Sequence, residues 1–182
     1  MRQTLKLHSV SLCPSVDRIE VEAERTGGPS LALRYVVLGR TADLRIPAPA
    51  VAGRSDGLWR RTCFEAFIRA PGGEAYWEFN FSPSGQWAAY GFADYRRGGG
   101  DIEAVGPLRL DVQVDRDRLA LRVTVDMSGV ERLPDGPWRM GLSAVIEDAE
   151  GAISYWALAH PPGKPVCHHP ECGAAELVPP ER

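Results

Sequence analysis

The feature that most constrains the fold is a succession of short strand-like segments separated by turns, with no long amphipathic helix between them. Segment 18–25 alternates apolar and charged residues, as half-buried strands do, segment 30–38 places Leu31, Leu33 and Tyr35 on one face, and 118–126 is expected to form a hairpin with 107–114. The chain contains 19 glycines and 15 prolines, which suits many tight turns. Roughly nine to eleven short strands at this spacing predict an all-β fold.

The turn residues divide the rest of the chain in the same way. Further strands are expected at 43–46, 58–69, 74–82, 86–93, 107–114, 138–147 and 153–158. A loop is expected at 47–57, one helical turn near Ser128–Leu133, and an irregular tail from about 159 to 182. The length of 182 residues fits a single domain. We expect a two-sheet antiparallel β-sandwich of the jelly-roll kind, with a lipocalin-like closed barrel as the alternative.

Strand alternation sorts the side chains of the most aromatic region into two sets. In 61–69, Phe64, Ala66 and Ile68 share the face opposite to Arg61, Cys63, Glu65 and Phe67. In 76–81, Trp77, Phe79 and Phe81 oppose Tyr76, Glu78 and Asn80. Phe64, Phe79 and Phe81 are therefore predicted core residues, and the polar residues are predicted to project from the other side of the sheet.

Polar side chains that share one face of neighbouring strands indicate a ligand site. A carboxylate between Phe64 and Phe67 is costly to bury unless a partner or a ligand compensates it. Aromatic rings beside carboxylates and amides suit a sugar, whose ring stacks on the aromatics while its hydroxyls bond the polar groups. The predicted ligand-binding residues are Trp59, Arg61, Glu65, Glu78, Asn80, Arg96 and His160.

Two other interpretations of these residues stay open. Glu65 could form a structural ion pair with Arg61 or Arg96, and the aromatics could all be core. Glu65 and Glu78 also raise the question of a glycosidase, in which a carboxyl lies on each side of the scissile bond. The sequence contains no P-loop or dinucleotide-binding motif, and we expect a protein that is not an enzyme.

The tail contains residue types that bind metals. His160, Cys167, His168, His169 and Cys172 lie close together, but their spacing matches no familiar structural zinc frame. We therefore expect no bound metal and no cofactor.

Composition bears on partners and location. The net charge of −3 and the pI near 5.8 give no indication of nucleic-acid binding. No stretch reaches the length of a membrane helix, and the first residues do not have the pattern of a signal peptide. We expect a cytoplasmic protein in which Cys13, Cys63, Cys167 and Cys172 are reduced thiols. The sequence does not predict its oligomeric state.

Two stretches resemble a known family. Residues 58–97 and 138–172 are similar to the bacterial DOMON-like domains, which are similar in turn to family 9 carbohydrate-binding modules. The resemblance covers about residues 3–178 and implies a jelly-roll β-sandwich. Trp59 and Glu65 match the modules, whereas Thr62 stands where they have an acidic residue. An aromatic-x-Phe-Asn-x-x-Pro-x-Gly pattern is matched by Trp77, Phe79, Asn80, Pro83 and Gly85.

The resemblance also bears on function. The wider superfamily binds sugars or haem, and the haem-binding members use Met and His as axial ligands. Met127 and Met140 are the only internal methionines, and neither forms an evident pair with a histidine. The leading hypothesis is a non-catalytic domain that binds a carbohydrate or a related polar ring compound. The alternatives are a structural or protein-interaction sandwich without a small ligand, and a haem-binding DOMON domain.

Overall fold

The chain forms strands along most of its length. The computed structural model describes residues 1–182 except 28, 71, 132, 134, 166 and 181–182. The strands are β1 (Arg2–Leu7), β2 (Val16–Arg25), β3 (Ser30–Gly39), β4 (Gly53–Arg54), β5 (Cys63–Arg69), β6 (Tyr76–Phe81), β7 (Gln86–Phe92), β8 (Gly100–Asp101), β9 (Leu110–Val114), β10 (Arg118–Asp126), β11 (Trp138–Glu147), β12 (Ile153–Ala157) and β13 (Ala175–Leu177). The described helices are the short 3-10 turns η1 (Thr41–Asp43), η2 (Leu58–Arg60) and η3 (Pro170–Cys172). This composition confirms the all-β class.

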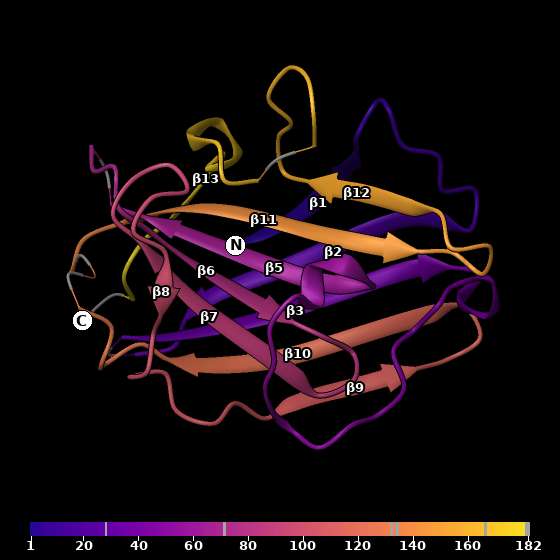
Figure 1. The fold of residues 1–182 in the computed structure, drawn as a ribbon, viewed down its shortest axis with the longest axis horizontal. Coiled ribbons are helices and arrows are strands. Elements are labelled where there is room, and N and C mark those ends of the chain that lie inside the picture. The colour runs from indigo at the N-terminus through magenta and orange to yellow at the C-terminus, as the bar shows by residue number, and fades with distance from the viewer. Residues whose placement is uncertain (28, 71, 132, 134, 166, 181–182) are drawn as a thin grey trace.

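Hydrogen bonds join the strands in the order β4-β7-β6-β5-β11-β12-β1-β2-β3-β10-β9, with β13 beside β11 and β8 beside β7. The first residues of β1 pair with β2, and its last residues, Lys6 and Leu7, pair with β12. The sheet therefore curls through β1 so that its two halves overlap (Figure 1). We call β4, β7, β6, β5, β11 and β12 the β5 half, and β2, β3, β10 and β9 the β3 half.

This topology bears on both predicted architectures. The path is continuous, so a division into two separate sheets is not confirmed. It ends at β4 and at β9, and no pairing among the described residues closes it into a barrel. All the pairings on this path are antiparallel except that of β4 with β7.

The core lies between the two halves. Phe64, Phe79 and Phe81 are fully buried there, as the alternation predicted. The ring centroid of Tyr35 in β3 lies 4.9 Å from that of Phe64 in β5. The Tyr35 hydroxyl donates a 2.7 Å hydrogen bond to the Glu65 carbonyl oxygen. This bond crosses the core and fixes β5 relative to β3.

Several predicted elements differ from the structure. Residues 43–46 were expected to form a strand, but they contribute only the end of η1 and one bridge, Leu44 to Asp148. Pro47 and Pro49 follow directly and have no N–H for a ladder, which explains why no strand continues there. Residues 58–60 form η2, so the strand expected at 58–69 begins at Cys63.

Other differences concern short or terminal segments. β1, β4, β8 and β13 were not predicted. Near Ser128–Leu133, residue 132 lies outside the described residues. The described part has a turn in which the Val130 N–H donates to the Met127 carbonyl, rather than a helix. No helix among the described residues is long and apolar enough to cross a membrane.

Candidate functional site

The outer face of the β5 half carries the polar residues that alternation placed there. In the β5–β6 register, Glu65 stands opposite Asn80 and Phe67 opposite Glu78. On the other side of β5, Ser143 of β11 stands opposite Glu65. Directly opposed residues in an antiparallel pair have Cβ atoms about 5 Å apart, so these side chains form one compact group.

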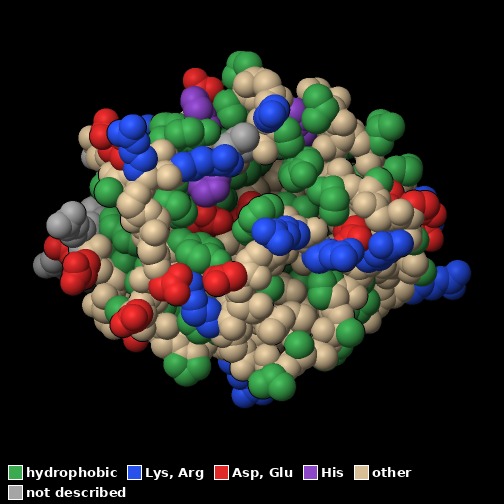
Figure 2. Space-filling view, viewed as in Figure 1, with side chains coloured by type: hydrophobic (Ala, Val, Ile, Leu, Met, Phe, Trp, Pro, Cys, Tyr) green, Lys and Arg blue, Asp and Glu red, His purple; other side chains and the backbone are tan. Residues whose placement is uncertain are grey.

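A cavity of about 610 Å³ lies over this face. Figure 2 shows it as a hollow, with histidine and acidic side chains at its edge and basic side chains around it. Glu65, Glu78 and Ser143 contribute polar groups to its lining. Its aromatic lining consists of Trp59, Phe67, Tyr90, Phe92, Tyr155 and Trp156. Ligand pockets of a few hundred Å³ commonly have this composition, with few polar groups among many apolar ones.

Glu65 lies on the cavity floor and is 8% exposed. The Ser143 hydroxyl donates a 2.7 Å hydrogen bond to its Oε2. Burial raises the pKa of Glu65 to about 7, and the negative charge of Glu78 contributes in the same direction. The Ser143 hydrogen bond opposes the shift because it stabilises the carboxylate. Near neutral pH both the protonated and the ionised form of this carboxyl are therefore populated.

Glu78 and His168 form the second polar group of the floor. Asn80 Nδ2 donates a 2.8 Å hydrogen bond to Glu78 Oε1, and burial raises the pKa of Glu78. His168 Nε2 lies 3.7 Å from Glu78 Oε2. Burial lowers the pKa of His168 to about 4, with smaller contributions from the charges of Arg96 and Arg69. His168 is therefore neutral near pH 7 and does not neutralise Glu78.

The ring of His168 is held by its neighbours. Its centroid lies 5.4 Å from that of Phe67 and 5.5 Å from that of Phe92, both in edge contacts. Its Nδ1 lies 2.8 Å from the Tyr76 hydroxyl, which accepts a 3.2 Å hydrogen bond from the Arg96 N–H. The Tyr76 hydroxyl can therefore donate its proton to His168 Nδ1. The ring hydrogen of His168 is then on Nε2, the nitrogen that faces Glu78.

Four described residues of the tail, His160, Pro165, Cys167 and His168, line one side of the cavity. Arg69 Nη2 donates to the His168 carbonyl oxygen, and Arg139 Nη2 donates to the Gly173 carbonyl oxygen at 3.1 Å. Gly141 in β11 permits this close packing. A Cβ built there would lie 3.1 Å from the Cys172 carbonyl oxygen and 3.3 Å from the Phe67 Cβ. The tail was expected to be irregular, and it is anchored at these points.

The loop after β7 forms another wall. Arg96 has a positive φ of 53°, uncommon for a residue other than glycine. Its N–H thereby reaches the Tyr76 hydroxyl. Tyr90, in β7 at the same wall, donates a 2.7 Å hydrogen bond to Asp56 of the 47–57 loop.

The predicted site residues separate into two sets. Trp59, Glu65, Glu78, Arg96 and His160 all line the cavity. Trp59 is 48% exposed at its mouth, and His160 Nε2 donates a 2.7 Å hydrogen bond to the Lys6 carbonyl oxygen. Asn80 does not line the cavity. It is fully buried behind Glu78 and acts through its hydrogen bond to that carboxyl.

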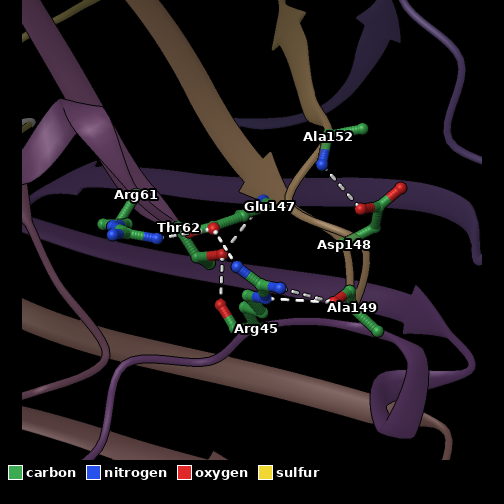
Figure 3. A network of polar contacts seen from close by, with 7 residues as sticks. All are labelled: Arg45, Arg61, Thr62, Glu147, Asp148, Ala149 and Ala152. Carbon is green, nitrogen blue, oxygen red and sulfur yellow. Dashed lines mark hydrogen bonds and ion pairs between the residues drawn. The ribbon is translucent and has the colours of Figure 1, made fainter.

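Arg61 also lies outside the cavity lining. Its Nη1 forms a 2.6 Å ion pair with Glu147 Oε1, which Arg45 Nη1 also contacts at 3.2 Å (Figure 3). The alternative considered from the sequence, an ion pair of Glu65 with Arg61 or Arg96, is not present among the described residues. The chain turns through η2 before β5 begins, and this places Arg61 beside the end of β11.

Solved structures with the same fold are known. A structure described as a "putative carbohydrate-binding protein" from Bacteroides uniformis matches with a TM-score of 0.68 and 18% identity, over 98% of this chain and 85% of that chain. A family 9 carbohydrate-binding module from Caldicellulosiruptor kristjanssonii in complex with cellotriose matches with a TM-score of 0.57 and 10% identity, over 100% and 83%. The fold is like that of family 9 carbohydrate-binding modules.

A second structure of a module from C. kristjanssonii, in complex with glucose, matches with a TM-score of 0.53 and 9% identity, over 98% of this chain and 85% of that chain. At these identities the likeness concerns the fold alone. No family model matches the sequence, and no curated protein does.

Sequence reasoning missed several residues of the cavity in this module-like fold. Ser143 could have been found from the sequence. Alternation in 138–147 places its side chain on the face of the strand away from the core residues Leu142 and Ala144. His168 was considered as a metal ligand or as one of the tail histidines that hydrogen-bond across the mouth of the sheet. Nothing in its local sequence indicates that the tail folds back over β5 and β6. Phe67, Tyr90 and Phe92 carry ambiguous signals, since aromatic residues in strands are more often core.

Haem and a metal ion were the two other ligands considered from the sequence, and the described side chains offer few groups to bind either. Met127 and Met140 belong to the core between the halves and do not line the cavity. The described residues therefore do not offer a methionine ligand for haem at this site. The residues that the structure describes also contain no group of three or more His, Cys, Asp and Glu side chains arranged to hold a metal ion.

Proposed function

We propose that this protein is a non-catalytic carbohydrate-binding domain and that the cavity over β5, β6 and β11 is its binding site. The observation that carries the proposal is the juxtaposition on one sheet face of Glu65, Glu78 and the aromatic side chains around them. Glu65 Oε1 has no hydrogen-bond partner among the described residues, so it is available to a sugar hydroxyl. The likeness of the fold to carbohydrate-binding modules supports the same class of ligand.

The aromatic residues favour binding over a purely structural role. Phe67, Tyr90 and Phe92 line the cavity and lie outside the core cluster. If all the aromatics served the core, this face would be filled rather than hollow. A preformed cavity loses little conformational entropy on binding a rigid ring compound.

The positions of the two carboxyls favour binding over hydrolysis. Glycosidases place one carboxyl on each side of the scissile bond. Glu65 and Glu78 instead project from neighbouring strands on the same face, so both approach a ligand from the floor. The cytoplasmic location and the absence of metal and cofactor stay predictions.

Trp59 provides the most direct test of the proposal. The side chain lies on η2 at the cavity mouth, with the Arg60 guanidinium 5.1 Å from its ring centroid. Calorimetric titration with a panel of monosaccharides and disaccharides is expected to identify at least one ligand. Trp59→Ala should weaken that binding about ten-fold or more, since a stacked aromatic contact contributes on the order of 1.5 kcal/mol.

Two matched variants complete this test. Trp59→Phe should retain most of the affinity because it keeps a ring at the cavity mouth. Arg122 lies in a second groove on the β3 half, so Arg122→Ala should not alter sugar binding. If no sugar binds, or if Trp59→Ala binds as tightly as the unaltered protein, the proposed site is wrong.

A further inference from the structure

The floor of the cavity carries two carboxyls without a cationic partner. Glu65 is 8% exposed and Glu78 is 4% exposed. Among the described residues, neither carboxyl lies within ion-pair distance of an arginine or a lysine. A buried carboxylate in an apolar cavity is costly, and its charge is normally met by a proton, a cation or a dense set of hydrogen bonds.

The hydrogen bonds of these carboxyls leave one oxygen of each available. Ser143 bonds only Oε2 of Glu65, and Asn80 bonds only Oε1 of Glu78. Glu78 Oε2 has the His168 ring at 3.7 Å, which is beyond hydrogen-bond distance. Glu65 belongs to the Glu65–Asn80 pair and Glu78 to the Phe67–Glu78 pair, so the two carboxyls stand diagonally on neighbouring strands. Their free oxygens can therefore reach one small group on the cavity floor.

The arginines of the cavity form no ion pair with the floor carboxyls among the described residues, although the charge of Arg96 lowers the pKa of Glu78 and so opposes the effect of burial. Arg60 and Arg96 line the cavity but are exposed at its mouth, where their guanidinium groups lie near the rings of Trp59 and Tyr95. His168, the cationic residue type nearest to Glu78, is held neutral by its surroundings. The floor is thus acidic and the rim basic, and a ligand that reaches the floor meets two acceptors.

We propose that the cavity selects a sugar with a protonated amino group, that is a hexosamine, and that the ammonium group lies between Glu65 and Glu78. The proposal rests on the proposed function, since it specifies which sugars that site prefers. An ammonium has three donors and no acceptor, which suits two free carboxylate oxygens. The ring of Phe67, opposite Glu78 on the same face, adds an apolar surface beside the cation.

Three sugars that differ at one carbon test this inference. Glucosamine carries an ammonium where glucose carries a hydroxyl and N-acetylglucosamine a neutral acetamide. Calorimetric titration at about pH 7 is expected to show that glucosamine binds at least about ten-fold more tightly than either neutral sugar, the scale of a charge-assisted hydrogen bond. Glu65→Gln and, independently, Glu78→Gln should each lower the ratio of the glucosamine affinity to the glucose affinity.

Controls separate this preference from a general attraction of cations to an acidic protein. Glu22→Gln alters a carboxyl in the groove of the β3 half and should preserve the ratio. Equal affinity for glucosamine and glucose would overturn the amine selectivity and leave the carbohydrate site standing. If none of the three sugars binds but another neutral sugar does, the amine selectivity likewise falls. If no sugar of any kind binds, the proposed function falls with it.

Discussion

Glu65→Gln is expected to stabilise the folded protein by about 3 kcal/mol at about pH 8 and to change its stability little at about pH 4. The folded-state pKa of Glu65, about 7, lies above its ordinary value of 4.5 because the carboxyl is buried beside Glu78. Protonated Glu65 suits the cavity floor, and its stability contribution is fully present below pH 4.5. The contribution is lost as the pH rises through 7. Glutamine is neutral throughout and does not suffer this loss.

The effect of Glu65 on the pH dependence of stability has to be measured as a difference between variants, because His168 contributes to that dependence as well. Its folded-state pKa of about 4 lies below the ordinary value of 6.5, so its contribution has the opposite sign and is lost as the pH falls from 6.5 towards 4. The two contributions partly cancel in the unaltered protein between about pH 4.5 and 6.5. Urea unfolding of Glu65→Gln and the unaltered protein, side by side at several pH values, isolates Glu65.

Two controls check the sign. Glu78→Gln should shift stability in the same direction, because burial raises the pKa of Glu78 as well. Asp43→Asn should do the opposite and destabilise the protein at neutral pH, because a hydrogen bond from Arg40 lowers the pKa of Asp43. If Glu65→Gln destabilised the protein at every pH, Glu65 would be a structural carboxylate and would lose its place as a ligand acceptor.

Thr62→Val is expected to destabilise the protein by about 2–4 kcal/mol. The Thr62 side chain is fully buried. Its hydroxyl donates a 2.8 Å hydrogen bond to the Arg45 carbonyl oxygen and accepts a 3.1 Å bond from the Glu147 N–H (Figure 3). Valine has the same shape without the hydroxyl, so both backbone groups lose this partner.

Thr62→Ser is the matched control for this prediction. It keeps the hydroxyl and removes only a methyl group, so it should cost less than about 1.5 kcal/mol. Urea unfolding of both variants at one pH gives the comparison. An equal loss in Thr62→Ser and Thr62→Val would attribute the effect to packing and would contradict the role given to the hydroxyl.

Thr62 also shows what a resemblance can and cannot predict. The resemblance implied an acidic residue at this position, and threonine in its place weakened the expectation of a calcium or sugar contact there. The structure shows that the hydroxyl joins the start of β5 to the end of β11 and to the loop at Arg45. These three segments are remote in sequence, so no local pattern indicates that they meet.

Alternation predicted the faces of β5 and β6 because a period of two follows directly from strand geometry. It placed Glu65 and Glu78 together and assigned Phe64, Phe79 and Phe81 to the core, and the structure agrees. Alternation predicts nothing about side chains beyond the ends of a strand. Arg61 lies in the turn after η2, and its partner Glu147 depends on the pairing of β11 with β5, which the sequence does not reveal.

The cavity walls depend on contacts between distant segments. His168 reaches the floor because Arg69 and Arg139 hold the tail and Gly141 lets it pack closely against β11. Arg96 contributes through a left-handed backbone conformation that its sequence does not predict. The sequence therefore predicted the two floor carboxyls, Glu65 and Glu78, whereas it did not predict that His168 joins them on the floor.

A crystal structure of the protein grown with its tightest-binding sugar tests the central claim most directly. The sugar is expected in the cavity of the β5 half, with hydrogen bonds to the Glu65 and Glu78 carboxyls and its ring against Trp59. A sugar bound instead in the groove of the β3 half, beside Arg34 and Arg122, would contradict the assignment of the site.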